Sequence, residues 1–258
     1  MPNFLKESAF RPHKSQYWLN QKREPDRQKK IGKICDLYLA ANGLAARGER
    51  VLCSDEKTGI QALERAAKTQ YSSLGMIERI EHNYARHGTQ CLIANFNVVT
   101  GKIEVPSVLN TRTEIDFVGH ITRTVESDPR VLRWHFVVDQ LNTHQSEGLV
   151  RLVATRDGLD LELGEKGVSG ILRSKATRAA FLNDSSHGVV FHYTPKHSSW
   201  MNQVEVWFSI LSRKFLKRSS FKSQAELKEG LLGFIEYFNA TMAKAFNWQF
   251  RGFQKANQ

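Results

Sequence analysis

Three acidic side chains stand at the ends of segments that are expected to be regular elements. Asp55 and Asp139 each follow a short apolar run, and Glu205 lies near the start of a helical pattern. Side chains at such positions emerge from a rigid scaffold, and carboxylates are the ligands that Mg²⁺ and Mn²⁺ prefer. Two such ions, roughly 3.5–4 Å apart, can activate an attacking oxygen and stabilise a leaving oxygen. We therefore predict that Asp55, Asp139 and Glu205 bind divalent cations and catalyse phosphodiester chemistry.

Two other interpretations of these acids remain open at this point. A lone aspartate at a strand end is more often an ordinary turn residue, so the spacing alone is a moderate signal. Glu56 directly follows Asp55, and alternation along a strand would place the two side chains on opposite faces. The sequence does not exclude Glu56 as the ligand.

The elements that must position these acids follow from apolar periodicity and from turn residues such as Thr100-Gly101. The expected strands are 49–55, 89–99, 102–109, 132–138 and 189–193, and the expected helices are 28–41, 112–126, 145–156, 200–217 and 224–242. Strands that meet helices in this order predict an α/β fold with a mixed sheet flanked by helices. Residues 157–187 are rich in glycine and charge and give no clear pattern.

The chain is strongly basic. Its 37 Lys and Arg against 26 Asp and Glu give a formal net charge of +11, so the expected partner is nucleic acid. The three cysteines form no CxxC pair, and no apolar run approaches the roughly 20 residues of a membrane span. No GxxxxGK[ST] loop indicates a nucleotide cofactor. We expect a cytoplasmic protein that binds double-stranded DNA and no membrane.

Three segments of the chain resemble the acidic motifs of a known enzyme family. They read CSDEKTG at 53–59, FVVDQLNTH at 136–144 and YTPKHSSWMNQVE at 193–205. In this order they are similar to the three motifs of the DDE transposases. The similarity is greatest to the bacterial insertion-sequence branch of the mariner superfamily, and it extends from about Arg11 to Gly252.

The resemblance implies an RNase H-like fold with a five-stranded mixed sheet. It implies that Asp55, Asp139 and Glu205 bind two Mg²⁺ or Mn²⁺ ions. The residues expected to support them are Asn142, His144 and Asn202. The implied activity is cleavage of DNA at transposon ends, followed by attack of the freed 3′-hydroxyl on target DNA. A homodimer is implied because two ends must be joined, and the implied location is the bacterial nucleoid.

The sequence departs from the family pattern in three places. The gap between the second and third acids is longer than in the compact eukaryotic relatives, and the surplus falls in 157–187. Ser198-Ser199-Trp200 replaces the common Ser-Pro-Asp. Family members usually carry paired helix-turn-helix modules before the catalytic domain, and this chain is expected to start after them. The expected layout is a basic arm and linker helix at 1–47, the catalytic domain at 48–222 with an insertion near 157–187, and a C-terminal helix and tail at 223–258.

A basic surface is expected beside the third acid. No acid lies between Glu205 and Glu226, whereas several Lys and Arg follow the predicted helix core. Such residues bind DNA through its phosphates, although a solvated helix face is the alternative. The residues expected to bind DNA are Arg11, Lys14, Lys196, Arg213, Lys214, Lys217 and Arg218.

Three functions are compatible with these patterns. The first is a transposase catalytic domain, and the second is an RNase H-like nuclease that does not transpose. The third is a catalytically silent DNA-binding remnant or regulator of a full-length transposase. The presence of all three acids favours an enzyme, and the expected absence of the recognition modules favours a remnant.

The basic composition generates the first testable prediction. Affinity for plain duplex DNA should fall steeply between about 50 and 200 mM salt, because each neutralised phosphate releases condensed counterions. Fluorescence anisotropy across that range measures the slope of log affinity against log salt. A flat dependence would contradict phosphate neutralisation as the basis of binding.

Overall fold

The computed structural model describes residues 24, 26–67 and 81–251. Its centre is one five-stranded sheet in the order β3-β2-β1-β4-β5. β1 pairs antiparallel with β2 and β2 with β3, whereas β1 pairs parallel with β4 and β4 with β5. The strands are β1 Glu49–Arg65, β2 Tyr84–Asn97, β3 Ile103–Leu109, β4 Arg133–Val138 and β5 Val189–Tyr193. The predicted mixed sheet is confirmed.

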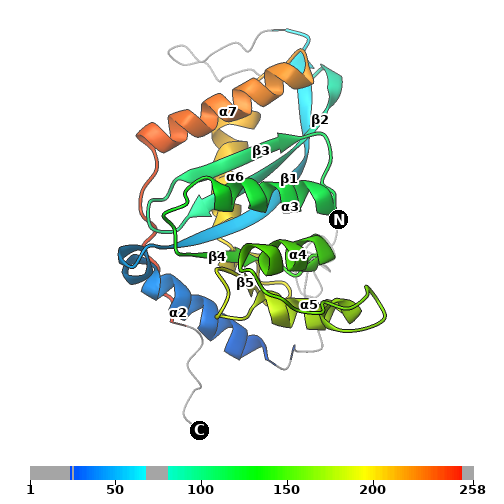
Figure 1. Cartoon of the computed structure of the whole chain (residues 1–258). Coiled ribbons are helices and arrows are strands. Elements are labelled where there is room, and N and C mark those ends of the chain that lie inside the picture. The colour runs from blue at the N-terminus through cyan, green and yellow to red at the C-terminus, as the bar shows by residue number, and fades with distance from the viewer. Residues whose placement is uncertain (1–23, 25, 68–80, 252–258) are drawn as a thin grey trace, which may run out of the picture.

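Helices cover both faces of this sheet (Figure 1). One face packs against α2, α6 and α7, and the other packs against α3, α4 and α5. The helices are α2 Arg27–Ala46, α3 Glu114–Glu126, α4 Glu147–Arg156, α5 Lys175–Leu182, α6 Val204–Leu211 and α7 Gln224–Thr241. Figure 1 shows α7 beside the β2–β3 part of the sheet and α2 near β5 at the opposite end. Helices long and apolar enough to cross a lipid bilayer are absent from the residues described.

The two cores follow from alternation along the central strands. On β1, Cys53 faces the α2–α6–α7 side, and its neighbour Leu52 faces the α3–α4–α5 side. On β4, Val137 faces the α2–α6–α7 side and Phe136 faces the α3–α4–α5 side. All four of these side chains are fully buried. A strand that is apolar on both faces must be covered on both faces. β1 and β4 are therefore packed on both faces; β1 contains Asp55, and Asp139 directly follows β4.

Local signals fix the beginning of two helices and one turn. Thr113 and Asp116 form a capping box at the start of α3, and the Ser223 hydroxyl accepts a hydrogen bond from the backbone of Glu226 at the start of α7. Gly101 turns between β2 and β3 with φ 69°. A side chain at Gly101 would also overlap the backbone of Lys244, so the hairpin and the C-terminal segment meet only because glycine is there.

Several elements differ from the expectations. β1 was expected to end at Asp55 but runs to Arg65, and β2 begins at Tyr84 and not at 89, because the two strands pair as a long antiparallel ladder. Asp55 therefore lies within a strand and not at its end.

The segment 157–187, which gave no pattern, contains a 3₁₀ turn at Ile171–Arg173 and helix α5. The helix expected over 200–217 is shorter, because Asn202 has an extended conformation (φ −85°, ψ 103°) that separates a 3₁₀ turn, Ser199–Met201, from α6. After α6 the chain continues as a π-helical turn, Ser212–Leu216.

The packing of α6 generates a stability prediction. Trp207 is 1% exposed and contacts Phe208 and Phe238 within one core. Replacing Trp207 with Ala should lower the free energy of unfolding by about 3–5 kcal/mol, because a cavity replaces a large apolar ring. Val206→Ala is the matched control, since Val206 is 49% exposed on the same helix and its loss should change stability by less than about 0.5 kcal/mol. Denaturant titration of both variants measures this difference, and equal effects would contradict the assigned packing.

Candidate active site

The parallel pairing of β1 with β4 brings Asp55 and Asp139 together. Cys53 pairs with Val137 in the register of these strands, and continuing it by two residues sets Asp55 opposite Asp139. Neighbouring strands lie about 4.8 Å apart, so the two aspartates are near each other where β4 ends. The charge of Asp139 accordingly acts on the pKa of Asp55. This juxtaposition was predicted only as a shared position at strand ends.

Asp55 is held in a nearly closed environment, with 8% of the residue exposed. Its Oδ1 accepts a hydrogen bond from the backbone nitrogen of Glu56 at 2.8 Å, and its Oδ2 accepts one from Asn202 Nδ2 at 3.2 Å. Burial raises the pKa of Asp55 to about 7; the positive charge of His144 opposes this rise, and the carboxylate of Asp139 adds to it. Asp55 is thus a carboxylate that lacks sufficient positive charge around it.

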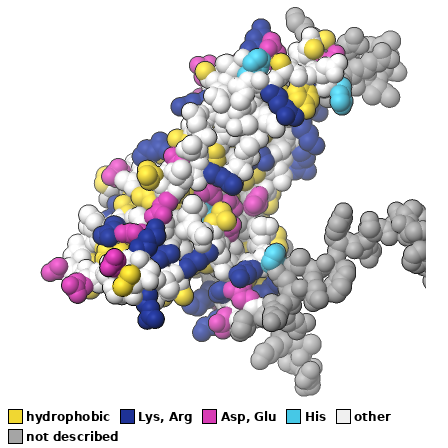
Figure 2. Space-filling model, turned by 90° about the vertical axis from the view of Figure 1, so that its right-hand side faces the viewer, with side chains coloured by type: hydrophobic (Ala, Val, Ile, Leu, Met, Phe, Trp, Pro, Cys, Tyr) yellow, Lys and Arg dark blue, Asp and Glu magenta, His cyan; other side chains and the backbone are white. Residues whose placement is uncertain are grey.

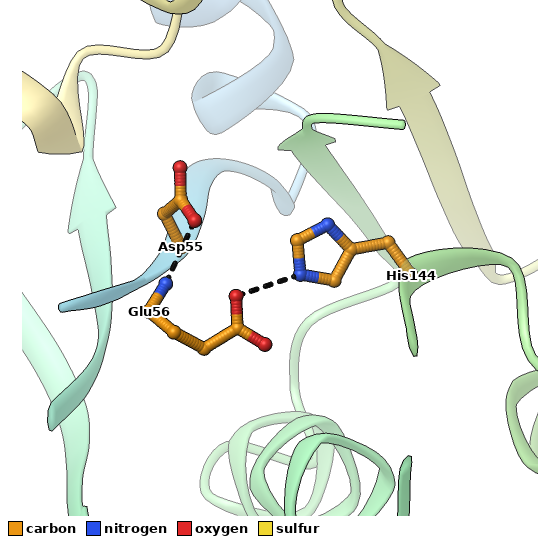
Figure 3. A group of neighbouring side chains, drawn as sticks. All are labelled: Asp55, Glu56 and His144. Carbon is orange, nitrogen blue, oxygen red and sulfur yellow. Dashed lines mark hydrogen bonds and ion pairs between the residues drawn. The ribbon is translucent and has the colours of Figure 1, made fainter. Parts of the chain in front are cut away.

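His144 connects Asp139 to Glu56. Figure 3 shows its contact with Glu56 beside Asp55. Its Nδ1 lies 2.7 Å from Asp139 Oδ1, its Nε2 lies 3.0 Å from Glu56 Oε2, and its ring packs on Phe117 at 4.3 Å. Burial would lower the pKa of His144, but the two carboxylates raise it to about 10. In return, although burial opposes it, the contact with His144 lowers the pKa of Asp139. His144 is therefore a buried cation at neutral pH, and it fixes the Asp139 carboxylate.

Glu56 is the residue of this group whose role sequence reasoning did not identify. Its side chain is 5% exposed and points to the α3 side of β1, opposite to Asp55. The acid pair Asp55-Glu56 was the only signal for it in the sequence. Nothing in the sequence could show that Glu56 meets His144, because the two residues lie 88 positions apart.

Glu205 and Asn142 are placed differently from the two aspartates. Glu205 lies in the first turn of α6, is exposed, and forms no hydrogen bond or ion pair through its carboxylate with the residues described. It stands close to the site because its backbone nitrogen bonds to Asn202, whose side chain contacts Asp55. Asn142 is exposed in the loop after β4, and its side chain does not cap the following turn.

The oxygen atoms of this site fit hard divalent cations. Asp55 and Asp139 supply carboxylates, and Asn202 Oδ1 is buried with no hydrogen-bond partner. One atom each of Asp55, Glu56 and His144 also lies within 4.8 Å of the others. Both ring nitrogens of His144 contact carboxylates, Nδ1 that of Asp139 and Nε2 that of Glu56, so His144 is a positive neighbour in this arrangement. The donor set that remains consists of oxygen, which suits Mg²⁺ or Mn²⁺.

Basic side chains adjoin the site on the α6 side. Lys57, Arg213 and Lys217 line a shallow groove of about 290 Å³ together with Glu205. Lys214, Arg218 and Lys196, which were also expected to bind DNA, are exposed. Arg11 and Lys14 lie outside the described residues. On the face seen in Figure 2, Lys and Arg side chains occur along the length of the protein with Asp and Glu between them.

The Asp139–His144–Glu56 arrangement generates a pH prediction. His144 has a folded-state pKa of about 10 and an ordinary value of 6.5, so its stabilising contribution is complete below pH 6.5 and is lost as pH rises towards 10. In EDTA at about pH 6, the free energy of unfolding of the wild-type protein, measured by denaturant titration, should exceed that of His144→Asn by on the order of a few kcal/mol. That difference should shrink as pH approaches 10. A difference that stays constant across this range would contradict a protonated His144.

Comparisons with known proteins agree with this geometry. The chain aligns with three structures of the Mos1 transposase over 95% of its length: the paired-end complex with the left transposon end (13% identity, TM-score 0.53), the mariner paired-end complex with Mn (14%, 0.52) and the strand transfer complex (13%, 0.51). The alignment covers 64%, 64% and 63% of those chains, so this chain spans less than two thirds of their length.

These likenesses confirm the RNase H-like fold that was expected. No curated protein matches the chain. The sequence model of the family described as DDE superfamily endonuclease matches residues 50–228, which include Asp55, Asp139 and Glu205. Because this match spans well over half of the sequence, the chain belongs to the DDE superfamily endonucleases.

Proposed function

We propose that this chain is the catalytic domain of a transposase from the bacterial insertion-sequence branch of the mariner superfamily. It would cleave DNA phosphodiester bonds at transposon ends and transfer the freed 3′-hydroxyl to target DNA. The observation that carries this proposal is the side-by-side placement of Asp55 and Asp139 in a member of the DDE endonuclease family. The aligned Mos1 structures support it, since they are described as paired-end and strand transfer complexes and one contains Mn.

Asp55, Asp139 and Glu205 would hold two Mg²⁺ or Mn²⁺ ions. Bound there, such ions activate the attacking oxygen and stabilise the leaving oxygen. Each protein residue then has a separate task. His144 keeps Asp139 ionised and oriented, and Asn202 orients Asp55 through its amide. Glu205 is exposed at the start of α6, where it can complete the ligand set beside the two aspartates.

The two strand carboxylates are costly to ionise together without added positive charge. Burial and Asp139 hold the pKa of Asp55 near 7, so a neighbouring cation favours its ionised form. His144 supplies one positive charge from the Asp139 side. Residues Arg213 and Lys217, in the groove beside Glu205, would bind phosphates of the DNA strand near the reacting bond.

Several further features belong to the same proposal. Residues 48–222 would form the catalytic domain, the basic arm and α2 within 1–47 would join it to DNA-recognition modules, and 223–258 would support it from the α7 side. Two copies would act together as a homodimer, because a transposase joins two transposon ends. The protein would work at the bacterial nucleoid.

One observation favours the alternative of a catalytically silent DNA-binding protein or regulator. Glu205 is exposed, and its carboxylate forms no hydrogen bond or ion pair among the residues described. A site in which the third acid cannot reach the cations would bind DNA without cutting it. The following experiment separates the two functions.

Supercoiled plasmid incubated with the protein and Mg²⁺ or Mn²⁺ should be nicked, and EDTA should prevent nicking. Asp139→Asn should abolish cleavage with nearly unchanged folding and nonspecific DNA binding. It removes one ligand charge at constant volume, and the Asn oxygen can still accept the bond from His144. Asp55→Asn and Glu205→Gln should have the same effect.

The matched control is Glu126→Gln, an exposed acid at the end of α3 that lies outside the site. It should cut at the wild-type rate. Undiminished cutting by Asp139→Asn would refute the site. Cutting by Glu205→Gln alone would assign the third ligand to another acid, and DNA binding without any cutting would support the silent alternative.

A further inference from the structure

A second basic surface adjoins the loop that follows Asp139. A cavity of about 720 Å³ opens between α2, α5 and the loop that follows β5. The lysines that line this α2–α5 basic groove are Lys29, Lys30, Lys33, Lys175 and Lys196. We propose that the groove binds the phosphate backbone of the DNA strand that extends from the cleavage site towards β5. This inference rests on the proposed DNA-cleaving function.

The groove has an excess of positive charge that the protein itself does not neutralise. Asp26 is the acidic residue in its lining, and Glu24 forms an ion pair with Lys30 nearby. Lys29 and Lys33 are exposed and form no hydrogen bond or ion pair with any described residue. The first turn of α2 also contains no acid, although the positive end of a helix dipole disfavours cations there. A bound polyanion would neutralise the unpaired lysines and would also interact favourably with the positive end of the helix dipole.

The groove leads directly to Asp139. Lys175 Nζ donates a hydrogen bond to the backbone oxygen of Gln140 at 2.7 Å, and Gln140 directly follows Asp139. On the opposite wall, the Tyr193 hydroxyl donates to the backbone oxygen of His144 at 2.9 Å. A strand whose reacting phosphate lies at Asp139 would therefore enter the groove on leaving the site. The groove beside Glu205 would hold the same DNA on the other side.

The arrangement of the lysines favours a DNA backbone over a small anion. They come from two helices and a loop, and four of the five are exposed, so they follow an open groove and do not converge on one buried point. DNA presents a phosphate about every 3.4 Å along each strand, which matches charges spread along a surface. Apolar residues Ile34, Ala176 and Ala179 also line the groove, where sugars could pack.

The wall formed by α5 was not foreseen from the acidic motifs. It lies in 157–187, the surplus that separates the second and third motifs. Lys175 at its start joins this segment to the loop that carries Asp139. Under this proposal, the longer segment between the second and third motifs supplies one side of a DNA channel.

The first test uses the double variant Lys29→Gln/Lys33→Gln. Its matched control is Lys102→Gln/Lys228→Gln, which removes two exposed lysines from the β2–β3 turn and from α7. Binding of a labelled duplex is measured in EDTA, so the result does not depend on catalysis. The groove variant should bind on the order of tenfold more weakly, and its salt slope should fall by roughly two, whereas the control should match wild type. Equal affinity and slope in both variants would overturn the proposal.

The second test locates the DNA. The native cysteines Cys35, Cys53 and Cys91 are all buried, so Lys33→Cys introduces a thiol that is accessible. Duplexes with a tethered mixed disulfide on one backbone phosphate should exchange with the Lys33→Cys thiolate, forming a protein–DNA disulfide and releasing the small thiol. They should not crosslink to Lys102→Cys. Absence of crosslinking at every tether position would overturn the proposal. So would a change of oligomeric state in Lys29→Gln/Lys33→Gln with unchanged DNA affinity, because it would assign the groove to a second copy of this chain.

These outcomes are distinct from failure of the proposed function. If the plasmid is never nicked but the groove variant loses DNA affinity, catalysis is refuted and the groove stands. If nicking depends on Asp139 but the groove variant binds like wild type, the groove is refuted and catalysis stands.

Discussion

The parallel pairing of β1 with β4 is the constraint on which the site depends. It sets Asp55, within β1, beside Asp139, which directly follows the last residue of β4. Both strands have buried apolar side chains on both faces there. Rigid neighbours hold the two carboxylates close, although like charges at this distance repel and burial disfavours both. The rise in the pKa of Asp55 to about 7 is the measure of that conflict. Two neighbouring carboxylates whose mutual repulsion is not neutralised are well suited to bind a cation.

Positive charge from the protein lowers the pKa of Asp139 but does not offset the rise at Asp55. His144 is a buried cation between Asp139 and Glu56, and it lowers the pKa of Asp139 while Asp55 stays raised. Asn202 offers Asp55 an N–H and no charge. The pKa values of the two aspartates are therefore shifted in opposite directions. Under the proposed function, a bound cation would favour the ionised form of Asp55.

Lys and Arg side chains in two surface grooves add positive charge at a greater distance from the acids. The groove beside Glu205 and the α2–α5 basic groove are both rich in Lys or Arg. The first includes a candidate acid, and the second includes Gln140, which directly follows Asp139. Carboxylates repel phosphate, and nearby cations offset this repulsion, which is the electrostatic condition for placing DNA at a carboxylate site.

The sequence by itself determined the sheet, its covering helices and the three candidate acids. Apolar runs and turn residues placed β2, β3, β4 and β5 closely, because burial on one or both faces leaves a periodic record along the chain. α6 was predicted too long, because the local pattern could not show that Asn202 leaves the helix to bind Asp55. α5 and its Lys175 were missed, since the segment has no clear periodicity.

Only the tertiary structure decided which residues meet. Glu56, His144 and Asp139 form one group because the strand that carries Glu56 and the loop after β4 converge from positions far apart in the chain. The lysines of α2 and α5 form one groove for the same reason. Periodicity records which face of an element is buried, but not which distant partner covers it. Those contacts depend on the order and register of the strands, which no local pattern contains.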